Sequence, residues 1–355
     1  MSLLPIGVIG CGRIARQVHL PILRTLPNVR IVALAEMDAN ALESAHQLVP
    51  QADCFSDAGS VLNHSEVEAV VIALPNTLHA TTAIEAFAHG KHVYLEKPLA
   101  LTCEEGQQVV TAWKKAAKVG AIGFNYRFNP LLVEAQKLLK ADAIGPLVAV
   151  RSSFCTPFKG EPQWKTQRAS GGGVLFDLAS HHVDLVEFLA GHPVVEVWAQ
   201  TRSVNMEMDT ATIELRLQNG VLVQELFSQS ATERDAWEFE GQNGRLRVER
   251  YTMSGVEITR PGELGLSARL KRTARENSPR GIARTLRYTK RKLREPNHEP
   301  SYRVALSEFV NATQNTPSTH LATPQDGLRN LEIITALETS ARTGVRVQLS
   351  FPIVA

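Results

Sequence analysis

The sequence has few cysteines and no long apolar run, and each absence excludes a class of protein. The four cysteines lie far apart, at positions 11, 54, 103 and 155, so no C-x-x-C pair is present for a zinc knuckle or a redox dithiol. Widely spaced free thiols are typical of a reducing compartment, and we expect a cytoplasmic protein. No apolar stretch reaches the roughly 18–20 residues that a transmembrane segment needs.

The chain also lacks an excess of either charge. Its 38 Lys and Arg nearly balance 36 Asp and Glu, which gives a formal net charge of +2. A surface that binds nucleic acid in general needs a stronger basic excess, so we expect no nucleic-acid partner. The apolar first residues carry no basic flank and run directly into a glycine-rich loop, so they are typical of a strand and not of a signal peptide.

The first 124 residues alternate short apolar runs with stretches of helical spacing. This alternation predicts an α/β fold, a doubly wound parallel sheet of the Rossmann type with helices on both faces. The predicted strands are 6–10, 30–35, 69–74, 92–95 and 121–124. The predicted helices are 14–26, 39–49, 77–89 and 104–118.

The pattern changes from about residue 125 onward. Helical spacing recurs at 130–139, 175–189 and 328–343, whereas residues 194–258 show period two, typical of an antiparallel meander with one buried face. A last strand is predicted at 345–349. We therefore predict a nucleotide-binding domain over 1–124 and an α+β domain with a large, mostly antiparallel open sheet over 125–355.

One segment of the second domain is strongly basic. Residues 269–294 hold eleven Lys and Arg against one acid, Glu276, and form an insertion over 269–296. A solvated basic loop is the simplest interpretation of such a run. Docking of an anionic partner, a membrane surface or an anionic substrate tail are the alternatives.

The first predicted strand ends in a glycine loop of the form G-x-G-x-x-G/A. Two glycines permit a tight turn and a close approach to a pyrophosphate, and the following helix N-terminus faces the phosphates. The residues of this loop expected to bind a cofactor are Gly10, Gly12, Arg13 and Ile14. Glu36, 21 residues beyond Ala15, ends the second strand, where an acid accepts hydrogen bonds from the adenosine ribose. Because a carboxylate there repels a 2′-phosphate, the loop predicts NAD over NADP.

Two stretches carry candidate catalytic residues. Lys97 follows the predicted strand 92–95, so it lies at the carboxyl end where open parallel sheets bind ligands. In the second stretch, three glycines precede a helix on which Asp177 and His181 are spaced i, i+4 and share one face. A carboxylate beside an imidazole suits a histidine that takes a proton from an alcohol.

Two other interpretations of the second stretch stay open. Asp177 and His181 can form a structural pair that pins the helix. A metal site made of His181, His182 and Asp184 is less favoured, because adjacent histidines diverge on a helix and no further ligand cluster completes the set, so no metal is expected.

Taken in their order along the sequence, the motifs of this chain resemble those of one family over nearly its whole length. Besides the glycine loop, they are Leu74–His79, Glu96–Pro98, Gly123–Pro130, the glycine-to-histidine stretch at 171–184, and residues 326–328. They resemble the glucose-fructose oxidoreductase, inositol dehydrogenase and MocA-like oxidoreductases. Members of that family mostly transfer a hydride between a nicotinamide cofactor and a carbon of a sugar, cyclitol or related derivative. The resemblance further implies that the second domain, 125–355, binds substrate and that its open sheet forms the interface of a homodimer or homotetramer.

The resemblance also implies roles for single residues. Lys97, Asp177 and His181 match the catalytic trio, and Arg127 lies near the substrate with Lys97 and His181. The other matched cofactor positions are Pro75, Asn76, His79, Glu96, Asn125 and Trp164. Lys165 stands where many members carry arginine, so this cofactor contact is expected to differ.

Three alternatives to the leading function remain within the resemblance. They are an NAD-dependent enzyme that cleaves glycosides without net redox change, a non-catalytic nucleotide-sensing homologue, and a reductase of a linear tetrapyrrole. The basic segment favours an anionic substrate, such as a uronate or a nucleotide sugar.

Overall fold

The computed structural model describes residues 3–160, 163–263, 278–316 and 318–350. It divides the chain into two compact units, one formed by 1–128 with 295–332 and the other by 129–294 with 333–355. The predicted division into 1–124 and 125–355 did not include the return of residues 295–332 to the first unit. Among the described residues, no helix is long and apolar enough to cross a membrane.

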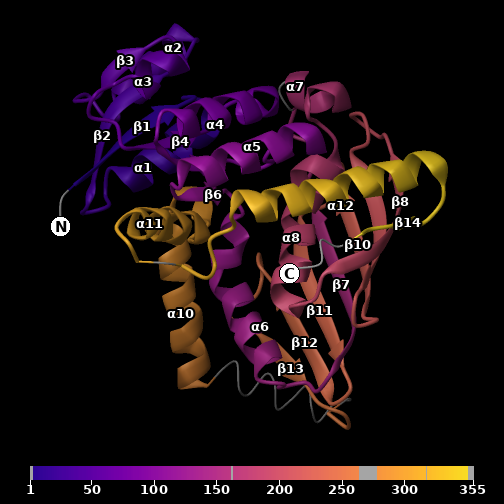
Figure 1. Cartoon of the computed structure of the whole chain (residues 1–355). Coiled ribbons are helices and arrows are strands. Elements are labelled where there is room, and N and C mark those ends of the chain that lie inside the picture. Colours follow the sequence, from indigo (N-terminus) through magenta and orange to yellow (C-terminus); the bar gives the residue numbers. More distant parts are fainter. Residues whose placement is uncertain (1–2, 161–162, 264–277, 317, 351–355) are drawn as a thin grey trace. The chain divides into compact units, whose positions relative to one another are not determined.

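The first unit contains a six-stranded parallel sheet in the order β3-β2-β1-β4-β5-β6 (Figure 1). The strands are β1 (Leu4–Ile9), β2 (Val29–Ala35), β3 (Asp53–Phe55), β4 (Ala69–Ile72), β5 (His92–Leu95) and β6 (Gly120–Ile122). Every residue of β1 and of β4 is buried, as expected for central strands covered on both faces. The strand order reverses between β1 and β4, which is the point where such sheets bind ligands.

The helices of the first unit lie between the strands along the chain. They are η1 (Ala15–His19), α1 (Leu20–Leu23), α2 (Ala39–His46), α3 (Ala58–Leu62), η2 (Asn76–Leu78), α4 (His79–Ala88), α5 (Cys103–Ala116), η3 (Asn125–Phe128), η6 (Pro296–His298) and α11 (Ser301–Thr313). Three of these helices, α2, α3 and α5, begin directly after a polar capping residue. The side chains of Asp38, Asp57 and Thr102 accept hydrogen bonds from amides in the first turn of these helices. The helix predicted over 14–26 contains a π-helical turn, η1, close to its start.

The second unit is built on an eight-stranded sheet in the order β13-β12-β11-β7-β10-β9-β8-β14. The strands are β7 (Leu147–Cys155), β8 (Val194–Arg202), β9 (Thr210–Leu217), β10 (Leu222–Ser228), β11 (Arg234–Gly241), β12 (Gly244–Glu249), β13 (Glu257–Thr259) and β14 (Val347–Gln348). All neighbours are antiparallel except β7 and β10, which pair in parallel. The predicted mostly antiparallel sheet is confirmed, but β7 was not predicted and separates β10 from β11.

Helices cover one face of this second sheet. They include α6 (Pro130–Lys140) and α8 (Ser180–Ala190), which contact each other and pack on β12 and β7 respectively. The remaining helical segments are α7 (Gln163–Thr166), η4 (Arg168–Ser170), η5 (Leu175–Ala179) and α10 (Pro279–Arg294), while α12 (Pro324–Thr343) begins in the first unit and ends in the second. Alternate residues of β9 and β10 are buried against the helices, which explains the period-two pattern.

The structure corrects the interpretation of the basic segment. Residues 264–277 lie outside the described part of the chain, but residues 279–294 form the helix α10. The prediction of a loop is therefore wrong for this half. Hydrophobic periodicity alone did not reveal the helix, because this segment has few large apolar side chains among its many Lys and Arg.

Candidate active site

The predicted cofactor residues of the first unit lie at one edge of its sheet. Because the strands are parallel, the segments that follow β1, β2, β4, β5 and β6 all leave the sheet at its carboxyl edge. Backbone hydrogen bonds join these segments, from Gly10 N to Ala35 O at 2.8 Å and from Ala73 N to Ile9 O at 2.8 Å. The sequence motifs separated along the chain are thus brought to a common edge.

The glycine loop has the conformation that the motif requires at two positions. Gly10 adopts a φ of +91°, and a Cβ there would lie 2.5 Å from the carbonyl oxygen of Ala73. A Cβ on Gly12 would meet no atom within 4 Å, so the backbone at this position faces open space. Arg13 is exposed and Ile14 is half-buried. The loop therefore leaves room for a ligand to approach the backbone at Gly12.

Glu36 is tied to the glycine loop by its carboxylate. One oxygen accepts a hydrogen bond from the amide of Cys11 at 2.8 Å, and the other accepts from the amide of Asp38 at 3.1 Å. Burial and the nearby Glu36 raise the pKa of the Cys11 thiol to about 12, so this cysteine stays protonated and is a poor nucleophile. Glu36 lies at the predicted position next to the loop.

Glu96 is held by a buried histidine that sequence reasoning missed. Its Oε1 lies 2.9 Å from Nε2 of His19, whose side chain is completely buried and packs edge-on against the rings of Tyr94 and Tyr302. A Cβ on Gly123 would lie 2.9 Å from the other Glu96 oxygen, so this glycine makes room for the carboxylate. The sequence contained one signal for this residue. His19 follows Ala15 by four residues, a spacing that places both side chains on the same buried side of the helix.

His79 joins two of the loops through both ring nitrogens. Nδ1 lies 2.6 Å from the carbonyl oxygen of Pro98 and Nε2 lies 2.9 Å from that of Leu74. Burial lowers the pKa of His79, and a neutral imidazole can donate to only one of these two carbonyls. The ring thus positions the loop after β4 against the segment Glu96–Pro98, which includes the half-buried Lys97.

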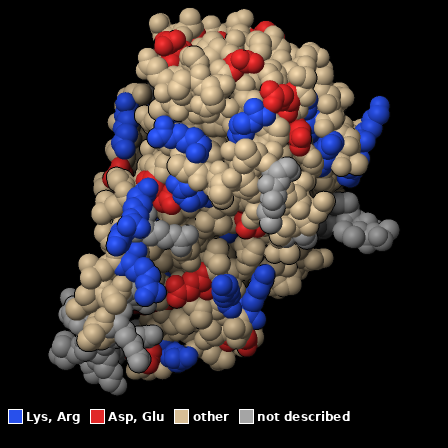
Figure 2. Space-filling model, turned by 90° about the vertical axis from the view of Figure 1, so that its left-hand side faces the viewer, with Lys and Arg blue, Asp and Glu red and all other residues tan. Residues whose placement is uncertain are grey.

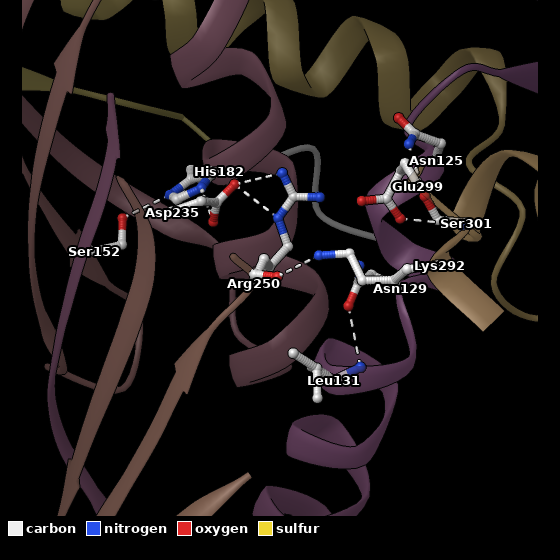
Figure 3. Close-up of polar contacts among 10 residues, drawn as sticks. All are labelled: Asn125, Asn129, Leu131, Ser152, His182, Asp235, Arg250, Lys292, Glu299 and Ser301. Carbon is white, nitrogen blue, oxygen red and sulfur yellow. Dashed lines mark hydrogen bonds and ion pairs between the residues drawn. The ribbon is translucent and has the colours of Figure 1, made fainter. Parts of the chain in front are cut away.

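Asn125 and Arg127 are buried within the first unit, each with a partner from the later part of the chain. The Asn125 amide nitrogen donates to the Ser301 hydroxyl at 2.8 Å, and the Ser301 backbone amide donates to the Glu299 carboxylate at 3.1 Å (Figure 3). Arg127 lies 3.5 Å from the carboxylate of Asp326, and its side chain is 9% exposed. These partners explain why residues 295–332 complete the first unit.

The second unit holds the other candidate catalytic residues. Asp177 lies in the π-helical turn η5 and His181 in the following helix α8, so a single regular helix, as predicted over 175–189, is not formed. π-helical turns of this kind occur frequently at functional sites. One Asp177 oxygen accepts a hydrogen bond from the amide of Gln229 at 2.9 Å and lies 3.3 Å from the ammonium of Lys165. Gln229 and Lys165 therefore fix the Asp177 carboxylate.

The triple glycine before this helix packs against protein backbone. A Cβ on Gly172 would lie 2.2 Å from the carbonyl oxygen of Lys165, and the Gly172 amide donates to the carbonyl of Gln167 at 2.9 Å. Gly173 has a φ of +91°. The glycines accordingly bring the α7 segment, which carries Lys165, close to η5.

His182 belongs to a buried polar network. Its Nδ1 lies 2.7 Å from the Ser152 hydroxyl, and its Nε2 lies 3.5 Å from Asp235, which Arg250 contacts at 2.6 Å (Figure 3). The His182 and Asp235 side chains are fully buried, so this serine–histidine–aspartate chain is structural. Within the described ranges, no group of three or more His, Cys, Asp or Glu is arranged to hold a metal ion.

The remaining predicted cofactor residues lie on short segments. Pro75 is exposed and Asn76 is half-buried in the loop after β4. Trp164 belongs to α7, but its side chain lies outside the described part of the structure.

Two family models match this chain. The model of an oxidoreductase family with an NAD-binding Rossmann fold matches residues 4–124, and that of the GFO/IDH/MocA C-terminal domain matches residues 132–247. The chain belongs to the GFO/IDH/MocA oxidoreductase family. The predicted family and fold class are thereby confirmed, and the NAD-binding Rossmann fold of the family agrees with the cofactor predicted from Glu36.

The proteins similar to this chain include enzymes named for sugars. Levoglucosan dehydrogenase of Pseudarthrobacter phenanthrenivorans is 32% identical over 200 residues, which are 55% of this chain and 49% of that protein. The chain therefore spans only about half the length of that relative. D-glucoside 3-dehydrogenase of Escherichia coli is 23% identical over 98% of each protein.

A solved structure shares the fold over its whole length. The WlbA dehydrogenase from Bordetella pertussis, crystallised with NADH and UDP-GlcNAcA, superposes with a TM-score of 0.82 over 99% of both chains at 24% identity.

Proposed function

We propose that this oxidoreductase is an NAD-dependent dehydrogenase that acts on a hydroxyl-bearing carbon of a sugar, a cyclitol or a sugar derivative. The observation that carries the proposal is the placement of Lys97 on the same sheet edge as the glycine loop and Glu36, inside the part of the chain that matches the NAD-binding family model. A lysine there lies where ligands bind in open parallel sheets.

The residues present fit an NAD molecule. The open backbone at Gly12 accommodates a pyrophosphate, while Glu36 at the end of β2 suits an adenosine ribose. The Oδ1 of Asn125 is buried and accepts no hydrogen bond from the described residues, so it is available to a donor group. When bound, the nicotinamide ring exchanges a hydride with the substrate carbon.

The chain supplies the proton chemistry and the charge stabilisation. Lys97 donates a hydrogen bond to the reacting oxygen and stabilises the negative charge that develops on it. His181 accepts the hydroxyl proton in oxidation and returns it in reduction. Asp177 positions the reacting groups, and its own orientation is fixed by Gln229 and Lys165.

Two buried histidines act as positioning residues for Lys97. His19 holds Glu96, the residue immediately before Lys97, and His79 holds the carbonyl of Pro98, the residue immediately after it. The His79 contact fixes the backbone after the lysine, and the His19 contact fixes the side chain of the residue before it, so the lysine extends from a fixed segment.

The names of relatives guide the choice of substrates. Levoglucosan dehydrogenase and D-glucoside 3-dehydrogenase are named for sugars, and the Bordetella structure holds the nucleotide-linked uronate UDP-GlcNAcA. We propose neutral sugars and cyclitols as the first substrates to examine and uronates or nucleotide sugars as the second. Substrate binding is assigned to Arg127, Lys97 and His181.

We further propose that the protein forms a homodimer or homotetramer through the open face of the second sheet. Leu222 and Leu226 of β10 are 58% and 43% exposed on that face, where ion pairs such as Arg216–Glu196 lie on neighbouring strands. A mixed apolar and polar surface of this kind is typical of subunit interfaces. Sedimentation velocity of the purified protein measures the oligomeric state directly.

The test of the proposed activity is the variant Lys97→Met. We expect NAD affinity, measured by calorimetry, to stay close to that of the wild type, while turnover on an accepted polyol falls by at least about 100-fold, the scale of losing one polarising donor. Lys159→Met is the matched control, because the Lys159 side chain is 67% exposed and its contact is a surface ion pair with Glu233.

Three results would contradict parts of the proposal. Near-normal turnover of Lys97→Met would remove this lysine from the chemistry. Absence of NAD and NADH binding to the wild type would contradict the cofactor assignment, and substrate conversion without net NADH formation would indicate a non-redox reaction instead.

A further inference from the structure

The helix α10 exposes a row of large apolar side chains. Ile282, Leu286 and Leu293 are 49%, 65% and 67% exposed. Their spacing of four and seven residues places them on one face of the helix, with the exposed Thr289 between them. Single exposed apolar residues are ordinary on a protein surface, but a row along one helix face indicates an interaction surface. We call these three side chains the apolar row.

The same helix is entirely cationic among its charged residues. Its sequence contains no acid, and its seven Lys and Arg are Arg280, Arg284, Arg287, Lys290, Arg291, Lys292 and Arg294. Arg287, Lys290 and Arg294 are exposed and follow the apolar row on one side of the helix. Over the face that Figure 2 draws, Lys and Arg are spread widely, with Asp and Glu between them.

The helix attaches to its own unit through its polar side. The Thr285 hydroxyl lies 2.9 Å from that of Ser254, and the Lys292 ammonium donates to the backbone carbonyl of Arg250 at 3.0 Å (Figure 3). Gly281 is buried and Tyr288 is half-buried. A surface helix of a globular protein normally turns its apolar stripe to the core, whereas α10 turns it outward.

We propose that α10 binds the surface of a membrane that contains acidic phospholipids. In this arrangement the apolar row enters the region between headgroups and acyl chains, and Arg287, Lys290 and Arg294 contact the acidic headgroups. A helix with a charged basic face and an apolar face is typical of such interfacial binding. The proposal concerns where the enzyme is held and does not depend on the substrate of the proposed reaction.

The observations favour a lipid surface over two other occupants. A nucleic acid would account for the cations but leave the apolar row in water. A second copy of the same helix would cover the apolar row but bring two helices without any acid face to face, and their like charges repel. An acidic bilayer satisfies both features.

Vesicle co-sedimentation of the full-length protein tests the proposal. The vesicles consist of phosphatidylcholine alone or of an equimolar mixture with phosphatidylglycerol. We expect binding to the acidic vesicles at least about tenfold above that to phosphatidylcholine, and a marked loss at high salt, because surface charges are screened. Absence of binding to the acidic vesicles would overturn the proposal.

Two variants separate the apolar and the electrostatic contributions. Leu286→Gln with Leu293→Gln removes most of the apolar row, and Arg287→Gln, Lys290→Gln and Arg294→Gln removes exposed cations. Each is expected to reduce binding to acidic vesicles by about tenfold. The control for the first is Val204→Gln with Val345→Gln, which are 53% and 59% exposed outside α10.

The control for the cation variant is Arg30→Gln with Lys159→Gln, since these exposed side chains lie outside α10. If the leucine variant bound as well as the wild type, attraction would be purely electrostatic and insertion of the apolar row would be refuted. If instead it changed the sedimentation coefficient of the lipid-free protein, a second copy would be the occupant. Circular dichroism of each variant checks that the fold is kept.

Discussion

Replacement of Glu225 by glutamine tests the electrostatics in the core of the second unit. Glu225 lies on β10 with its side chain completely buried, and its Oε1 accepts a hydrogen bond from the Ser152 hydroxyl at 2.6 Å. Burial raises the pKa of this carboxyl from its ordinary 4.5 to about 8. His182, at 3.8 Å, does not offset the burial, because its own pKa is lowered and it is neutral at pH 7.

The direction of the effect follows from proton binding in the two states. Between about pH 4.5 and about pH 8 the native state keeps a proton on Glu225 that the unfolded chain has lost. The free energy of unfolding therefore falls as pH rises through this window, by up to about 1.4 kcal/mol for each pH unit. Over the whole window the free energy of unfolding falls by roughly 4–5 kcal/mol. This figure is an upper bound, because interactions in the unfolded chain and entry of water into the core both reduce the loss.

Glu225→Gln replaces the titratable carboxyl by an amide, which does not titrate between about pH 4.5 and about pH 8. The amide oxygen can still accept the hydrogen bond from the Ser152 hydroxyl. We expect urea unfolding to show the wild type losing several kcal/mol relative to the variant between about pH 5 and about pH 8, with the two nearest in stability at the acid end. Glu134→Gln, an exposed position on α6, is the control and should leave the pH profile unchanged. Parallel profiles for the wild type and Glu225→Gln would refute the assignment of a raised pKa.

Two further predictions concern the buried ion pair and the cofactor preference. Arg250→Met should lower the free energy of unfolding, measured in urea, by about 3–5 kcal/mol, because it leaves the buried Asp235 carboxylate without its guanidinium partner. A loss below about 1 kcal/mol, the contribution of an exposed ion pair, would contradict this prediction. Glu36→Ser with Met37→Arg should shift binding from NAD towards NADP, measured by calorimetry, because the carboxylate that repels a 2′-phosphate is replaced by a cation. Unchanged preference would mean that Glu36 does not contact the ribose.

The sequence predicted most strands because their patterns report burial directly. β1 and β4 are apolar at nearly every position and buried on both faces, while β9 and β10 alternate and are buried on one. β3 was missed because it has only three residues, Asp53–Phe55, two of them exposed. Its place at the edge of the sheet explains why a short polar segment suffices.

The supporting residues of the candidate site could not be predicted, because their partners are distant in the sequence. His19 and Glu96 are 77 residues apart, and Asp177 and Gln229 are 52 apart. Periodicity describes which face of an element is buried but contains no information about which polar side chains meet there. Lys165 shows the same limit, since its departure from arginine was visible but its contact with Asp177 was not.

The contacts of His79 give a physical reason why two of the motifs occur together. The loop Leu74–His79 and the segment Glu96–Pro98 follow adjacent parallel strands, β4 and β5, so both leave the sheet at the same edge. The His79 ring spans them by contacting the carbonyls of Leu74 and Pro98, and it is 1% exposed. The histidine that ends the first motif therefore fixes the backbone that carries Lys97. The role that we propose for this lysine, stabilising charge on a substrate oxygen, requires such a fixed backbone.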